Sequence, residues 1–156
     1  MAANPLDEQI DQLYRLPLDG FTPARNALAK GAGPRANEIK RLEKPNAAAW
    51  AVNQLFWRER RIYDELIEAS QQLRAAYREQ LAGKSPDVRG AEATHKAAVK
   101  RATQTGRAMV EADGSKASEG VMVAVRETLD ILPSSDPPGR LTKPRWARGY
   151  LAPMPL

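Results

Sequence analysis

Residues 46–82 read NAAAWAVNQLFWRERRIYDELIEASQQLRAAYREQLA and contain neither Gly nor Pro. Asn46, at the start, is a residue type that commonly caps a helix. The stretch predicts one helix of about 36 residues, roughly 54 Å long at a rise of 1.5 Å per residue. The remaining elements are expected to cover the faces of this helix.

An apolar stripe follows this helix in steps of three and four residues, which is typical of an amphipathic helix. Glu59 lies within the stripe and allows two interpretations. It marks a break, bend or exposed edge, or it is a buried acid that needs a partner and whose pKa burial would raise. The stripe consists of Val52, Leu55, Glu59, Ile62, Leu66, Ala69, Leu73, Ala76 and Tyr77.

A second apolar face is formed by Trp50 and Trp57, because residues seven apart lie on the same side of a helix. We therefore expect residues 47–57 to be covered on two sides and residues 60–82 on one. Three short N-terminal helices are the natural cover for the tryptophans. They are predicted from Pro5 to Arg15, from a Thr22 N-cap to Lys30, and from Pro34 to Lys44.

The segment Gly83 to Pro86 is a tight connection that predicts an antiparallel helix hairpin, with Ser85 as N-cap and a second helix at 86–112. His95 lies on the apolar face of that helix and is expected to be a hydrogen-bonded core residue. A last helix is predicted from Lys116 to Leu132. No strand pattern is visible, so the predicted fold is an all-α bundle built on the hairpin of residues 46–82 and 86–112.

The predicted helical domain covers residues 1–132, and residues 133–156 form an extended Pro-rich tail. Much of the net charge of +5 belongs to this tail, because residues 137–156 carry four basic side chains and no acidic one. Its aromatic and apolar residues are unusual for a disordered segment. Either the tail docks on the bundle, or it is held ready for a partner.

Composition excludes several kinds of chemistry. The chain has no Cys and one His, so it lacks the residues for disulfides, cysteine chemistry and His-pair metal sites. It has no nucleotide-binding motif, and we predict a non-enzymatic protein without metal or cofactor; a buried Glu59 is the one acid–base alternative. No apolar run approaches 18 residues and no signal peptide is visible, which predicts a cytoplasmic protein without membrane contact.

Basic residues follow one side of the 86–112 helix. Arg89, Lys96, Lys100 and Arg107 fall within about 40° around the axis and span roughly 27 Å. With Lys143, Arg145, Trp146 and Arg148 of the tail, they predict weakly sequence-specific binding of DNA or RNA, in which Trp146 stacks on bases. An ordinary solvated helix face is the alternative for the stripe. The alternative function is a protein-interaction or self-associating module, in which a partner buries the long apolar stripe of residues 60–82.

Three segments resemble a widespread bacterial family of small helical proteins of unknown activity. The resemblance is carried by Ile39–Pro45 with the following run Ala48–Asn53, by Phe21, Ala24, Arg25, Leu28 and Ala29, and by Gly139–Thr142. It implies a helical fold. It also implies that Trp50, Asn53 and the tail matter for the structure or the function of the protein. It implies no activity.

Overall fold

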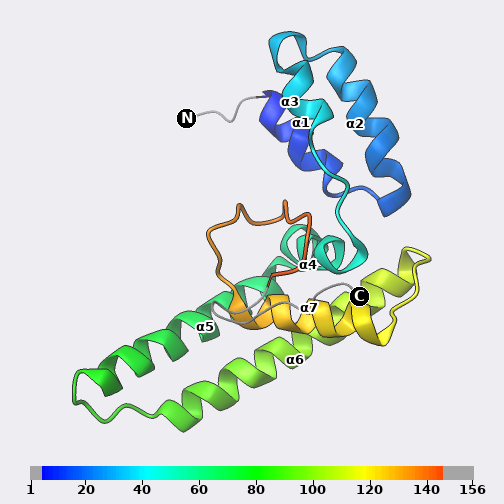
Figure 1. The fold of residues 1–156 in the computed structure, drawn as a ribbon. Helices are drawn as coiled ribbons and strands as arrows, with labels where there is room; N and C mark the ends of the chain where they lie inside the picture. The colour runs from blue at the N-terminus through cyan, green and yellow to red at the C-terminus, as the bar shows by residue number, and fades with distance from the viewer. Residues whose placement is uncertain (1–4, 146–156) are drawn as a thin grey trace, which may run out of the picture.

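The computed structural model describes residues 5–145, and helical residues make up 72% of that part. Seven α-helices, α1 to α7, and two short 3-10 turns follow one another, and residues 5–145 contain no strand (Figure 1). The predicted all-α fold is confirmed. None of the described helices combines the length and the apolar character needed to cross a membrane.

The predicted 46–82 helix is two helices, so the prediction of one continuous helix is wrong. Helix α4 spans Ala47–Arg58 and α5 spans Arg60–Leu81, and Glu59 between them has φ −127° and ψ 52°. The Arg60 guanidinium lies 4.1 Å from the centre of the Phe56 ring and braces the bend. Glu59 is half-buried, so it marks a break rather than a buried acid. The break lets α4 enter the core while α5 runs along its partner helix.

The hairpin is formed by α5 and α6 (Val88–Ala112), which lie antiparallel (Figure 1). Asp87, not Ser85, caps α6, because its carboxylate accepts a hydrogen bond of 2.9 Å from the Gly90 N–H. The apolar stripe of α5 is buried or half-buried as far as Ala76, so most of it is covered within the chain. Beyond that point Tyr77 is 41% exposed and Leu81 is 88% exposed.

Helix α7 (Glu119–Ile131) begins at a Ser118 cap, later than the predicted Lys116. It packs on α4 and α6. Gly106 of α6 lies where the three helices meet, and a Cβ built there would make ordinary van der Waals contacts, at 3.5 Å with Val125 Cγ1 and 3.9 Å with Ala51 Cβ.

The N-terminal helices form a small unit with its own apolar cluster. Helices α1 (Pro5–Leu13), α2 (Phe21–Lys30) and α3 (Ala36–Lys40) bury Ile10, Phe21 and Ile39 together. Several predicted boundaries are wrong, and α1 ends at Leu13 rather than Arg15. Helix α2 begins at Phe21 without a side-chain cap, and α3 ends at Lys40, after which the chain lacks helical structure as far as α4.

These three helices are not the main cover of the tryptophans, contrary to the prediction. Helix α4 is buried at every position from Ala48 to Leu55. The loop after α1 supplies part of the cover, because the Leu16 carbonyl accepts a hydrogen bond of 2.8 Å from Trp50 Nε1. Trp57 Nε1 donates instead to the Gly139 carbonyl at 2.9 Å. The tryptophan face of α4 is therefore covered by the loop after α1 and by the segment after α7.

Residues 133–145, here called the C-terminal strap, lie across α4. The Asn53 side chain donates to the Leu141 carbonyl at 2.8 Å and accepts from the Leu141 N–H at 2.7 Å. Arg140 forms an ion pair of 2.6 Å with Asp11 of α1. Docking, one of the two interpretations of the tail, therefore holds for residues 133–145; residues 146–156 lie outside the described residues.

Candidate functional site

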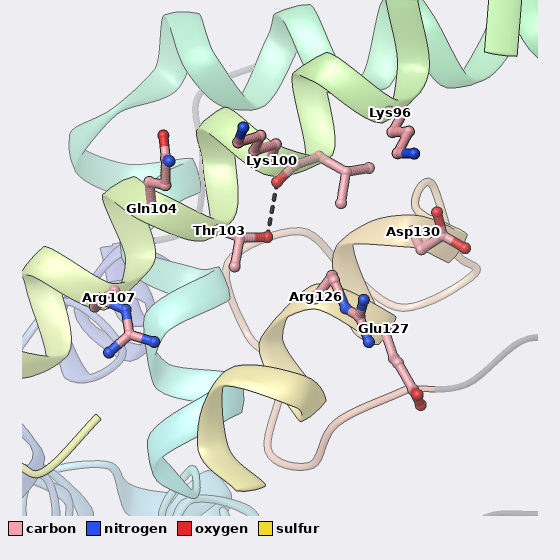
Figure 2. A pocket seen from close by; sticks show the side chains of 9 residues that line it. Lys96, Lys100, Thr103, Gln104, Arg107, Arg126, Glu127 and Asp130 are labelled. Carbon is pink, nitrogen blue, oxygen red and sulfur yellow. Dashed lines mark hydrogen bonds between the residues drawn. The ribbon is translucent and has the colours of Figure 1, made fainter. Parts of the chain in front are cut away.

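A groove of about 640 Å³ runs between α6 and α7. Figure 2 shows the side chains that line it. Three of its basic side chains come from α6 and one, Arg126, from α7. The lining residues are Lys96, Val99, Lys100, Thr103, Gln104, Arg107, Arg126, Glu127 and Asp130.

The structure brings three of the four predicted stripe residues to this groove. Lys96, Lys100 and Arg107 line it, and all three are exposed. Arg89 is exposed in the first turn of α6, close to the hairpin connection, and does not line the groove. The basic site is therefore shorter than the predicted stripe.

The two predicted tail residues that the structure describes, Lys143 and Arg145, do not line this groove. Lys143 is exposed on the strap. Arg145 is engaged by Asp136, whose carboxylate accepts hydrogen bonds of 2.7 and 3.0 Å from its guanidinium group. The same contact raises the pKa of Arg145 and lowers the pKa of Asp136. Arg145 thus closes the strap on itself, while Trp146 and Arg148 lie outside the described residues.

Arg126 was missed by the sequence analysis, which considered only the apolar face of the last helix. It stands four residues before Asp130, so the two share one side of α7. That spacing marks an exposed polar side of the helix. It does not reveal that the side faces α6, because the packing of two helices depends on contacts far apart in the chain.

None of the four groove cations has an acidic partner within ion-pair distance among the described residues. Among residues 5–145, no carboxylate lies within ion-pair distance of Lys96, Lys100, Arg107 or Arg126, whereas Arg35, Arg60, Arg61, Arg101, Arg140 and Arg145 are each paired. Arg107 makes one long contact of 3.5 Å, to the Ala117 carbonyl. The groove therefore carries four positive charges, none of them in an ion pair within the described residues, together with the carboxylates of Glu127 and Asp130.

Two carboxylates stand on the α7 wall. Figure 2 shows Asp130 at the same end of the groove as Lys96, while Glu127 extends away from α6. Asp130 Oδ1 lies 3.9 Å from Nδ1 of His95. His95 is only 7% exposed, and its Nε2 has no hydrogen-bond partner among residues 5–145. The predicted core position of His95 is confirmed, but its predicted hydrogen bonding is not, because the 3.9 Å contact of Nδ1 is longer than a hydrogen bond and Nε2 has no partner among residues 5–145.

The arrangement suits the binding of anions. The α6 wall supplies positive charge over the 12 residues from Lys96 to Arg107, which span about 16 Å of helix. The described residues contain no group of His, Cys, Asp and Glu side chains that could hold a metal ion. No aromatic ring from residues 5–145 lines the groove, so the described residues contribute charge and hydrogen bonding rather than stacking.

No protein-family model matches the chain, and comparison with curated proteins and with solved structures finds no significant match. The resemblance to the bacterial family of small helical proteins therefore stays a prediction. The structure does bring the segments that carry it together, because Asn46 N–H donates to the Thr142 carbonyl at 3.1 Å and Asn53 holds Leu141.

Proposed function

We propose that this chain is a non-enzymatic helical protein that binds nucleic acid, with little sequence preference, along the α6–α7 groove. One observation carries the proposal. Lys96, Lys100, Arg107 and Arg126 line a single groove, and none has an ion-pair partner among the described residues.

When a nucleic acid binds, Lys and Arg side chains of the protein take the place of the counterions around its phosphates. Cations without an acidic partner on a rigid surface are well suited to this role. The run from Lys96 to Arg107 covers about 16 Å of α6, which corresponds to roughly five nucleotides at 3.4 Å per nucleotide of one strand. Release of counterions would supply most of the binding free energy and would depend little on sequence.

The test is a fluorescence-anisotropy titration with duplex DNA, single-stranded DNA and RNA at low salt. With four phosphates neutralised, log K should fall against log salt with a slope of roughly −3 to −4. The triple variant Lys96→Glu, Lys100→Glu, Arg107→Glu should lose binding. Failure of all three nucleic acids to bind at tens of micromolar protein in about 50 mM salt would refute the proposal.

A matched control is available on the N-terminal unit. Lys30, Lys40 and Lys44 are exposed and lie away from the groove. Their replacement by Glu changes the net charge by the same amount as the groove variant. If both variants lose binding equally, the effect comes from overall charge and the groove has no special role.

Self-association is a second candidate function, supported by the hairpin end. Leu81 is 88% exposed and Tyr77 41% exposed there. Pairing of two hairpin ends would bury these side chains. Light scattering at micromolar concentration distinguishes the cases: a dimer that Leu81→Lys disrupts supports this function, and a strict monomer rules it out.

A further inference from the structure

The two walls of the α6–α7 groove differ in charge. The α6 wall contributes Lys96, Lys100 and Arg107, while the α7 wall contributes Asp130 and Glu127 beside Arg126. The side chain of Asp130 is 63% exposed, and no Lys or Arg side chain lies within ion-pair distance of it among residues 5–145; the His95 ring lies 3.9 Å away. A surface built only to hold phosphates gains nothing from such a carboxylate, because the two repel each other.

A nucleotide presents opposite chemistry at its two ends. The phosphate is an anion that suits the α6 cations, and the base edge of cytosine or adenine carries an exocyclic amino group that donates hydrogen bonds. A carboxylate accepts such a bond, and Asp or Glu pairs with the amino group of cytosine in known recognition codes. Thymine and uracil offer carbonyl oxygens at the corresponding position, which a carboxylate repels.

A duplex fits this pair of walls poorly. Its phosphates lie on the outside of both strands, and its bases are engaged with each other. A single strand can lay its phosphates against α6 and turn unpaired base edges toward α7, which is how proteins read single-stranded nucleic acids by their Watson–Crick edges. The carboxylate wall therefore favours one strand over two.

We propose that Asp130 is a base-selecting residue that gives the groove a preference for single strands carrying amino-bearing bases, with cytosine bound more tightly than thymine. This inference rests on the proposed function, because it assumes that phosphates lie against the α6 cations. Glu127 does not share the role, since Figure 2 shows its carboxylate extending away from α6.

The experiment compares short oligo-dC, short oligo-dT and a duplex of the same length by fluorescence anisotropy. The wild-type chain should bind oligo-dC about fivefold or more tightly than oligo-dT, in line with the discrimination that one good base contact gives. Asp130→Asn should bring the ratio close to one, because an amide donates as well as accepts and serves both bases.

Glu127→Gln is the matched control. Both variants remove one negative charge from the same helix, so both should raise affinity for all oligonucleotides slightly. Only Asp130→Asn should change the ratio of oligo-dC to oligo-dT. Circular dichroism checks that both variants keep the helical fold.

The outcomes separate the two proposals. If no oligonucleotide binds, the proposed function is wrong, and the base-selecting role of Asp130 is wrong as well. If oligonucleotides bind but the wild type treats oligo-dC and oligo-dT alike, or binds the duplex most tightly, nucleic-acid binding stands and base selection by Asp130 is wrong. Equal changes of the ratio in both variants also overturn the inference, because they reflect charge alone.

Discussion

At the scale of single residues, Gly139 shows how closely the strap fits α4. Its φ of +81° lies in the left-handed region that other residues avoid. A Cβ built at this position would lie 2.6 Å from Cε2 and Nε1 of Trp57. Two features therefore require glycine at position 139: the left-handed backbone conformation and the Trp57 ring, which leaves no room for a Cβ atom.

Gly139→Ala should therefore destabilise the protein more than a glycine replacement with backbone strain alone. Gly83 supplies the comparison, since its φ is +85° and nothing lies within 4 Å of a built Cβ. We expect Gly83→Ala to lower the free energy of unfolding by about 1–2 kcal/mol, and Gly139→Ala by about 1–3 kcal/mol more, which is the usual cost of overpacking. Urea unfolding followed by circular dichroism measures both; equal losses would show that the Trp57 contact costs nothing.

At the scale of elements, the strap acts as a closed loop rather than as a tail. Asp136 and Arg145 join its two ends by an ion pair, and Thr128 of α7 accepts a hydrogen bond of 3.0 Å from the Arg145 N–H. The strap thereby stays folded against α7 as well as α4. Hydrogen bonding from Arg145 is the main reason why the pKa of Asp136 is lowered.

This lowered pKa predicts how acid affects the strap. A carboxyl group with a depressed pKa in the folded state stabilises that state above its unfolded pKa, and the stabilisation is lost as the pH falls through the folded pKa. Stability should therefore fall below about pH 4, the ordinary range of an aspartate. Because both side chains are partly exposed, the effect should be modest. Urea unfolding of Asp136→Asn at neutral and acid pH should show a smaller pH-dependent loss than the wild type; an unchanged loss would mean that other carboxyl groups cause it.

Local signals predicted the elements well and their contacts poorly. The Asn46 cap is confirmed, with a hydrogen bond of 2.9 Å from the Ala49 N–H, because capping depends on residues only three apart. The break at Glu59 was left undecided, since neither Gly nor Pro marks it. The Trp57–Gly139 contact and the place of Arg126 in the groove depend on residues far apart in the chain, which periodicity along one helix does not report.

At the scale of the whole molecule, two apolar clusters are joined by polar contacts at their boundary. The N-terminal unit contacts the main bundle through the loop after α1, where the Tyr14 carbonyl accepts a hydrogen bond of 2.6 Å from Gln54. Arg140 of the strap adds the ion pair with Asp11 and a hydrogen bond of 3.1 Å to the Asp7 carbonyl. Through the Arg140 side chain, the strap thus fastens α1 to the bundle.

Arg140→Asp should loosen this attachment, because it sets two carboxylates against each other. We expect faster hydrogen exchange of the α1 amides, with α5 and α6 unchanged, since local openings need not involve the main core. The double variant Asp11→Arg, Arg140→Asp should restore protection by reversing the pair. Lys84→Asp, with the same charge change at the exposed hairpin connection, should have no effect on α1; if it does, overall charge rather than the ion pair is responsible.

The pairing of Asn53 with Leu141 has a consequence for the order in which the newly made chain folds on the ribosome. The two residues are 88 positions apart, which is about 4–18 s of translation at 5–20 residues per second. During that interval α4 can emerge, but the amide of Asn53 cannot be buried with both of its bonds made. The nascent protein must therefore keep this side of α4 open to water until the strap has been synthesised, so the strap closes over α4 only after α5, α6 and α7 have been made.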